Sequence, residues 1–226
     1  MNLLADTAEA SSTDPWLAPR ALYQDVAERL RLQIFDRQLE PGSWIDEQKL
    51  CTQWGISRTP MREALKVLAA EGLVTMKVRR GAYVTEVSER DLHEVYELLS
   101  LLESDAAAAL CRLGDDAALA ELNSLHDQLE QAARPGSGSR DRFFELNEKF
   151  HRRMLELANN RWRSQLVADL RKVMKLNRQG SLFKTGRIEE SLAEHRAILD
   201  ALLVRDAELA AQRVREHFAS GLQAAA

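Results

Sequence analysis

The stretch GISRTPMREALKVLAAEGLVTMKVRRG, residues 55–81, decides the fold of the first part of the chain. It predicts a short helix, a strand, a basic tip and a returning strand. Ser57 is a typical N-cap residue, and Pro60 falls in the first turn, where a missing N–H is harmless. Gly72 is expected to end the helix. One face of this helix carries apolar residues at helical spacing and should be buried: Ala64, Leu65, Leu68 and Ala69.

The other face of the same helix is basic and polar. Arg58, Thr59, Arg62 and Lys66 lie on its N-terminal and outward side, where the helix dipole also favours an anion. Arginine can donate twice to guanine, and threonine can reach a phosphate or a thymine methyl group. A solvated helix with ordinary surface charges is the alternative. The neighbouring residues favour a DNA-recognition helix.

The residues before and after this helix complete a DNA-binding motif. Residues 21–38 form an amphipathic helix, Pro41-Gly42 turns the chain, and Asp46 can cap a second short helix that runs to about residue 54. Gly55 then provides the turn of a helix-turn-helix. Two β-prone runs flank Arg79-Arg80-Gly81, which predicts a hairpin wing with a basic tip that can enter a minor groove.

Length, composition and charge agree with a two-domain protein of the cytoplasm. The 226 residues are 45% hydrophobic, contain no run long enough to cross a membrane, and open with no signal peptide. Cys51 and Cys111 match no metal or disulfide spacing and should be buried thiols. Residues 1–16 are expected to be a disordered tail. Although the chain has a net charge of −4, residues 57–80 hold six basic and two acidic side chains, which places positive charge where DNA would bind.

The motif also matches a known family. The pattern PGSWIDEQKLCTQWGISRTPMREALKVLAAEGLVTMKVRRGAYV, residues 41–84, resembles the winged-helix signature of the GntR family of bacterial transcription regulators, and the match covers about residues 20–87. The resemblance implies operator binding by the recognition helix and by Gly81 at the wing tip. Family members often have a basic residue in the second helix, where this chain has Gln48 and Lys49. Arg80 joins the DNA-binding set because of its charge and position. The complete expected set is Gln48, Lys49, Arg58, Thr59, Arg62, Arg80 and Gly81.

From residue 89 onward the pattern is almost wholly helical. Helices are expected over about 89–114, 117–133, 140–158, 161–179, 187–204 and 206–222, and RPGSGS at residues 134–139 is expected to be a flexible loop. Six helices with short connections predict an antiparallel bundle with room for a site among facing helices. The fold class is therefore mainly α: a winged helix-turn-helix over residues 17–88, followed by an all-α six-helix bundle over residues 89–226.

Four polar side chains interrupt this bundle at spacings that suit a metal. Asn147 and His151 share one helix face at i, i+4, while His195 and His217 sit among apolar positions of later helices. Three imidazoles and an amide oxygen can bind a divalent transition metal and leave positions open for water or a ligand. Satisfied core or surface histidines are the alternative. His93 and His126 lack partners at useful spacing and are interpreted as surface residues.

A second resemblance bears on this site. The segments FELNEKFHRRMLELANN, SLAEHRAILDALLVRD and AQRVREHF look like the metal-site segments of the FadR-type C-terminal ligand-binding domain, called FCD, across about residues 90–222. The usual ligands of that family fall on Asn147, His151, His195 and His217. Many members have aspartate where this chain has Asn147. Zinc or nickel is the expected metal, with iron or manganese open.

The FCD resemblance also implies a small organic acid bound beside the metal. Relatives often carry an arginine near the position of Leu99 that helps to hold the acid, and this chain has no base there. Lys175 or Arg178, from another helix, could substitute for it, although an ordinary exposed charge is the favoured interpretation of either. The class of acid stays open.

These observations predict a homodimeric transcription regulator that responds to a metabolite. Two winged helices would read two halves of a palindromic operator, and the bundle would bind the effector and change the spacing or mobility of the heads. Glu89-Arg90 marks the junction between the two parts. A sensor whose effector is the metal itself is the main alternative. A metal-dependent enzyme is disfavoured because no carboxylate has a motif-defined place as a general base, and no nucleophile motif occurs.

Overall fold

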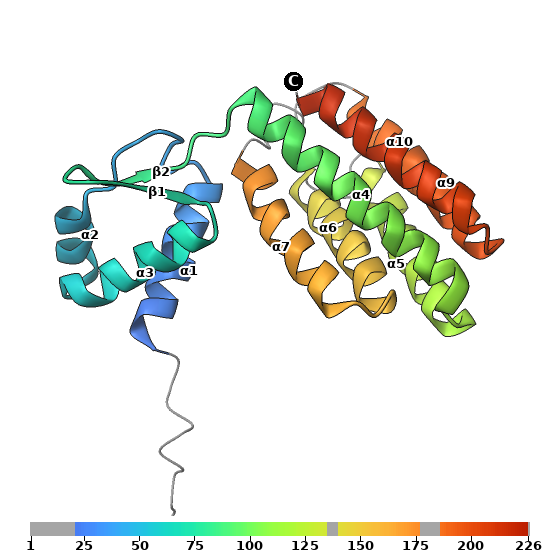
Figure 1. Cartoon of the computed structure of the whole chain (residues 1–226), viewed down its shortest axis with the longest axis horizontal. Coiled ribbons are helices and arrows are strands. Elements are labelled where there is room, and N and C mark those ends of the chain that lie inside the picture. Colours follow the sequence, from blue (N-terminus) through green and yellow to red (C-terminus); the bar gives the residue numbers. More distant parts are fainter. Residues whose placement is uncertain (1–20, 135–139, 177–185, 226) are drawn as a thin grey trace, which may run out of the picture.

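The structure is a computed structural model that describes residues 21–134, 140–176 and 186–225 (Figure 1). An N-terminal head holds three helices and a hairpin, and a separate bundle holds the remaining described helices. This agrees with the predicted mainly helical fold. The predicted tail at residues 1–16, most of the RPGSGS loop, and Arg178 fall outside the described residues.

The head is a helix-turn-helix followed by a hairpin: α1 (Leu22–Phe35), α2 (Glu47–Trp54), α3 (Arg58–Ala70), β1 (Val74–Lys77) and β2 (Gly81–Val84). Asp46 caps α2 as predicted, accepting from the backbone N–H of Lys49 at 3.0 Å. Ser57 occupies the N-cap position of α3 in an extended conformation, but its side chain makes no capping hydrogen bond. Helix α3 ends at Ala70, two residues before Gly72, whose φ of 76° explains why glycine stands there.

The hairpin forms the predicted wing. Strands β1 and β2 pair antiparallel from Val74 opposite Val84 to Lys77 opposite Gly81. Trp44 forms an isolated bridge with Tyr83, so the loop before α2 lies along the wing. Gly81 has a φ of 90°, and a Cβ built on it would lie 3.1 Å from Trp44 Nε1. The positive φ and the close approach of Trp44 therefore both favour glycine at position 81.

The bundle contains six helices in the described residues: α4 (Glu89–Leu113), α5 (Asp116–Ala133), α6 (Arg140–Leu157), α7 (Arg161–Leu176), α9 (Arg187–Leu203) and α10 (Ala207–Ala225). Their bounds follow the sequence prediction to within about three residues. Figure 1 shows α4 running along α10 on one side and facing α7 on the other. The largest fully buried side chains of the bundle are Phe143, Phe150, Leu99, Leu110 and Leu122. None of the helices in the described ranges is long and apolar enough to span a membrane.

One histidine was assigned wrongly from the sequence. His126 was expected on the surface, but its side chain is fully buried on α5. It stands four residues after Leu122 and three before Leu129, so it belongs to the apolar stripe of that helix. His93 is exposed and both cysteines are buried, as predicted.

Head and bundle touch at a second place besides the Glu89-Arg90 junction. Leu176, the last residue of α7, is 4% exposed and belongs to the buried core of the head. Its backbone oxygen accepts from the Arg37 guanidinium beyond the end of α1. Lys172 of α7 lies 3.2 Å from Glu71 at the C-terminal end of α3. Helix α7 is therefore shared between the two domains.

Candidate DNA-binding surface and metal site

Most of the predicted DNA-binding residues line one concave surface of the head. A hollow of about 720 Å³ lies between α2, the start of α3 and the wing. Thr59 is exposed on the first turn of α3, beside the hollow and not in its lining. The hollow includes six of the seven predicted residues: Gln48, Lys49, Arg58, Arg62, Arg80 and Gly81.

Neighbouring side chains hold the two arginines of α3 at this surface. Arg58 donates to the side-chain oxygen of Gln48 at 3.0 Å, and Arg62 lies 3.6 Å from the carboxylate of Glu47. Arg62 keeps 63% of its side chain exposed, so its donors remain accessible to a base edge. The surface therefore presents several positive donors in the geometry that helix-turn-helix proteins use for the major groove.

Sequence reasoning missed Trp44 as part of this surface. Its side chain is 54% exposed and lines the same hollow, with its indole under the wing glycine. The only sequence signal was the aromatic residue beside the Pro41-Gly42 turn.

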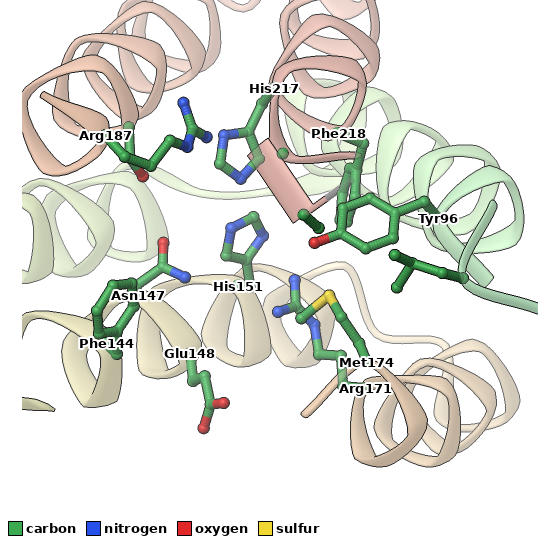
Figure 2. Close-up of a pocket in the computed structure, with 14 residues that line it drawn as sticks. Tyr96, Phe144, Asn147, Glu148, His151, Arg171, Met174, Arg187, His217 and Phe218 are labelled. Carbon is green, nitrogen blue, oxygen red and sulfur yellow. The ribbon is translucent and has the colours of Figure 1, made fainter. Parts of the chain in front are cut away.

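The three predicted histidines meet in the bundle. His151 comes from α6, His195 from α9 and His217 from α10, and all three are buried. One ring nitrogen from each can be chosen so that the three lie within 4.8 Å of one another. Figure 2 shows His151 and His217 facing each other, with Asn147 beside His151 on the same helix. These three residues line one small cavity. Residues 44 and 22 positions apart along the chain are thus brought to one point by helix packing.

The Nδ1 atom of each histidine faces an oxygen. His151 Nδ1 is 2.6 Å from Glu103 Oε2, and His217 Nδ1 is 2.7 Å from Glu194 Oε2. His195 Nδ1 is 2.6 Å from the backbone oxygen of Ser191. These acceptors place the proton on Nδ1 and leave the lone pair on Nε2, which is the arrangement around metal-binding histidines.

Two features of this arrangement fit a transition metal. The Nε2 atoms of His151 and His195 lie 3.0 Å apart, and two lone pairs at this distance repel unless a cation or a proton lies between them. Asn147 Oδ1 is buried with no hydrogen-bond partner, and the residue lines the same cavity. A cation bound between the imidazoles would satisfy their Nε2 lone pairs. Three imidazole nitrogens and one oxygen are a donor set that suits zinc or nickel.

The electrostatics keep the imidazoles ready for a cation. Burial would raise the pKa of Glu103, but the charges of Arg171 and His151 and their hydrogen bonds lower it to about 2. Burial, with the positive charge of Arg171, lowers the pKa of His151 to about 4. Burial also lowers the pKa of His195 well below its usual value. Both rings are therefore neutral near pH 7.

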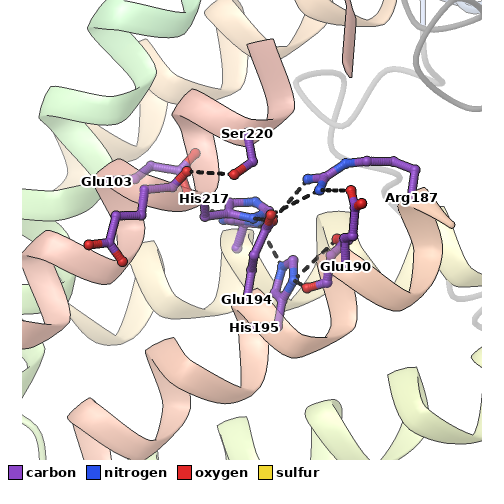
Figure 3. Close-up of polar contacts among 10 residues, drawn as sticks. Glu103, Arg187, Glu190, Glu194, His195, His217 and Ser220 are labelled. Atoms are coloured by element: carbon purple, nitrogen blue, oxygen red, sulfur yellow. Dashed lines mark hydrogen bonds and ion pairs between the residues drawn. The ribbon is translucent and has the colours of Figure 1, made fainter. Parts of the chain in front are cut away.

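Glu194 is held ionised in a similar way. Burial would raise its pKa, but hydrogen bonds from His217 and Arg187 lower it to about 2. Figure 3 shows Arg187 and His217 meeting the Glu194 carboxylate, with Glu190 beyond Arg187. Arg187 donates twice to Glu194, at 2.9 Å for each bond. This carboxylate therefore fixes both the imidazole and the guanidinium.

Sequence reasoning did not find these supporting carboxylates. Glu103 carried a recognisable signal, because it stands four residues after buried Leu99 and three before buried Ala106 on the apolar face of α4. A carboxylate on such a stripe needs a buried partner. Glu194 directly precedes His195 in sequence, and nothing in the spacing indicated that it would bind His217.

A cavity of about 100 Å³ adjoins the histidines. Its lining combines polar groups, among them Asn147, Arg171 and Arg187, with apolar side chains: Leu92, Tyr96, Phe144, Met174 and Phe218. Burial raises the pKa of Tyr96, which keeps its hydroxyl protonated.

The structure changes the expected positions of the cations near this cavity. Lys175 was expected to face the effector, but it does not line the cavity and instead lies 2.7 Å from Glu148 in an ion pair. Leu99, near which the FCD resemblance implies an arginine, is fully buried. Arg171 and Arg187 are the cationic side chains that reach the cavity among the described residues.

Comparison with known proteins identifies both domains. The model of bacterial regulatory proteins of the gntR family matches residues 22–84, and the FCD domain model matches residues 94–220. The chain belongs to the GntR family. This GntR-family regulator is 30% identical to the HTH-type transcriptional regulator YdhC of Bacillus subtilis (strain 168), over 88% of this chain and 89% of the relative. It is 25% identical to the gluconate operon transcriptional repressor of Bacillus licheniformis, over 91% and 85% of the two chains.

Solved structures share the fold of this regulator. E. coli McbR/YncC has a TM-score of 0.74 at 24% identity and covers 91% of this chain and 97% of its own. A GntR-family transcriptional regulator from Pseudomonas syringae pv. tomato str. DC3000 has a TM-score of 0.52 at 28% identity, over 91% and 86% of the chains. The Bacillus subtilis, Bacillus licheniformis and Pseudomonas syringae proteins are named as transcriptional regulators or repressors, which agrees with the prediction that this chain is a regulator.

Proposed function

We propose that this GntR-family regulator binds a palindromic operator as a homodimer and responds to a small organic acid held beside a metal in its FCD domain. The observation that carries the proposal is the convergence of three histidine nitrogens, each backed by an oxygen acceptor, beside a cavity in a protein with a DNA-binding head. DNA binding by the head does not itself require the metal or the acid.

The metal would be held by Asn147, His151, His195 and His217. When bound, it supplies a Lewis-acidic centre that can accept a carboxylate oxygen. Other residues of the protein orient the imidazole ligands. Glu103 and Glu194 orient two of the imidazoles, and Ser191 orients the third through its backbone oxygen.

Arg171 and Arg187 are proposed to hold the acid in place of the arginine that relatives carry near Leu99. Each is already paired with a carboxylate, Arg171 with Glu103 and Arg187 with Glu194. Because these pairs are close to neutral, the positive charge that attracts an acid would come mainly from the metal. We therefore expect the acid to bind much more weakly when the metal is removed.

The dimer is proposed to form through α4 and α7. Large apolar side chains are exposed on these adjacent helices: Leu98 (46%) and Leu101 (64%) on α4, and Trp162 (67%) and Leu166 (55%) on α7. An ion pair between Asp105 and Arg163 joins the two helices along this face. Exposed apolar groups gathered in this way are typical of protein interfaces. Leu101→Asp should shift the protein toward monomer in sedimentation equilibrium, whereas Val204→Asp, at an equally exposed position after α9, should not.

One titration tests the central proposal. Operator DNA is selected from a random pool, and its affinity for metal-free protein is followed by fluorescence anisotropy as zinc and then candidate acids are added. A change in affinity that needs both additions, and that is lost in His195→Ala, supports the proposal. Operator affinity should also fall steeply with salt, because phosphate contacts release counterions. An affinity for DNA that ignores sequence and salt would refute the role of the head.

A metal-sensing regulator is the second candidate. The observation that favours it is that Glu103 accepts hydrogen bonds from both His151 and Arg171. These bonds link the histidines to α7, the helix that touches the head. In that case zinc alone would switch operator affinity and added acids would have no effect. Turnover of an added acid would instead point to an enzyme.

A further inference from the structure

A second cavity lies next to the histidine cavity and shares a wall with it. A groove of about 660 Å³ runs between α1 of the head and α6 and α7 of the bundle. Glu148 and Arg171 line both the groove and the smaller cavity. Figure 2 shows both residues on one side of the histidine cavity, with the carboxylate of Glu148 directed away from His151. The side chains of Glu148 and Arg171 therefore form part of the wall between the two spaces.

The size of the two spaces limits what the site can hold. Pockets for small molecules usually measure roughly 300–1,000 Å³. The histidine cavity, at about 100 Å³, has room for a carboxylate and a few further atoms. The groove, at about 660 Å³, lies within the usual range. An acid longer than a few carbon atoms would fit only if it extended from the cavity into the groove.

An ion pair lies at the shared wall. Lys175 spans the wall from α7 to α6, with its ammonium 2.7 Å from Glu148. Their side chains are 29% and 26% exposed, so the pair is partly open to solvent. Lys175 also lies over the ring of Phe35, 5.5 Å from the ring centre, on the groove side. A passage between the two spaces would require these side chains to rotate.

The lining of the groove suits an acid with an apolar body. Phe35 and Ala168 expose apolar surface to the groove, while Leu155 and Val167, which also line it, are buried. Six basic and two acidic side chains also line the groove, and most of the basic ones are ion-paired: Arg31 and Lys172 with Glu71, Arg152 with Glu156, Arg171 with Glu103 and Lys175 with Glu148. Charge therefore gives the groove little preference for an anion, so the carboxylate of an acid would stay at the histidines and only its chain would enter the groove.

We propose that the regulator accepts an elongated organic acid whose carboxylate lies at the metal site and whose apolar chain passes between Glu148 and Arg171 into the groove. This inference rests on the proposed acid site and adds its ligand class. Because Phe35 and Arg31 of α1 line the groove, the chain of such an acid would touch the DNA-binding head directly. A short acid would reach only the bundle.

The test compares short and long linear acids on the zinc-loaded protein. Acetate, hexanoate and decanoate are titrated by isothermal calorimetry. Each added methylene that leaves water for the groove should strengthen binding about fourfold. Ala168→Trp places an indole in the groove and should abolish this gain while leaving acetate affinity unchanged. Ala120→Trp, at an exposed position of α5, is the matched control and should behave like the wild type.

The possible outcomes separate the two proposals. If acetate binds and decanoate binds no more tightly, the extension into the groove is wrong while the acid site stands. If Ala168→Trp keeps the full gain with chain length, the chain lies elsewhere and the inference is also wrong. If no acid binds the zinc-loaded protein, the acid site itself is refuted and this inference with it. The inference is supported if affinity rises with chain length in the wild type and in Ala120→Trp but not in Ala168→Trp.

Discussion

The ammonium of Lys172 on α7 lies 3.2 Å from the carboxylate of Glu71, which stands at the C-terminal end of the recognition helix α3. The preceding residue, Arg171, donates to Glu103, and Glu103 in turn binds His151. One helix therefore contacts both the reading head and the histidine site. This chain of packed and hydrogen-bonded groups gives a physical route for coupling, and its energetic role can be measured.

Replacing Lys172 should weaken this coupling. Lys172→Ala removes the ion pair with Glu71 but leaves the metal site intact. We expect the ratio of operator affinities with and without zinc and acid to move toward one, measured by fluorescence anisotropy. Lys149→Ala, at an exposed position of α6, is the control and should keep the wild-type ratio. An unchanged ratio in Lys172→Ala would show that coupling does not run through this ion pair.

Arg62 should contribute to the choice of operator sequence. Its side chain is 63% exposed in the hollow between α2, α3 and the wing, and is held only loosely by Glu47 at 3.6 Å. Arg62→Ala should reduce discrimination between the operator and a site with one changed base pair by about 1–3 kcal/mol. Arg90→Ala removes an exposed arginine of α4 that pairs with Glu94, and should leave discrimination unaltered. If Arg62→Ala, like Arg90→Ala, leaves discrimination between the two sites unaltered, Arg62 acts only as a phosphate contact.

Much of the architecture could be predicted from the sequence because its signals are local. The apolar stripes, the Asp46 cap and the glycines around α3 each act within a few residues, so helix bounds and the wing follow from short-range rules. The three histidines that converge in the bundle were also predicted to lie together, with the help of a family resemblance. His126 was misplaced because its lack of a partner outweighed its position on the apolar stripe of α5.

The missing parts of the site depend on contacts between distant segments. Glu103 reaches His151 across 48 residues and Arg171 across 68, and no local pattern encodes either approach. Lys175 was expected near the effector because of its charge alone, whereas the rotation of α7 turns it toward Glu148 and directs Arg171 to the cavity. Such facts depend on how helices pack, and sequence periodicity does not specify the angle between two helices.

Asn147→Asp should alter metal affinity and stability in opposite directions. The side-chain oxygen of Asn147 is buried without a hydrogen-bond partner. A carboxylate there would destabilise the metal-free protein, because it adds an uncompensated charge, but it would bind a divalent cation more strongly. We expect a lower melting temperature than the wild type without metal and a larger upward shift with zinc. Asn160→Asp, an exposed position before α7, is the control for the added charge. An equal zinc-induced shift in Asn147→Asp and the wild type would remove Asn147 from the ligand set.

The stability of the metal-free protein should depend on pH through the buried histidines. The pKa of His151 is about 4 in the folded protein, against 6.5 for an ordinary histidine. Between these two pKa values, His151 binds a proton in the unfolded chain but stays neutral in the folded protein. The free energy of unfolding therefore falls as pH drops from about 6.5 to 4. His151 alone should account for roughly 3 kcal/mol of this fall, and His195 acts in the same direction.

Glu103 adds a second and more acidic window. Its pKa of about 2 lies below the ordinary value of 4.5, so its contribution is present above pH 4.5 and is lost as pH falls toward 2. Urea unfolding in the presence of a chelator, at intervals from pH 7 to pH 4, isolates the histidine window. His151→Gln should flatten the profile there, whereas His93→Gln, at an exposed position of α4, should follow the wild type. A profile equally steep in His151→Gln and the wild type would mean that His151 is charged in the folded protein, in which case its Nε2 has no lone pair for a metal until that proton is lost.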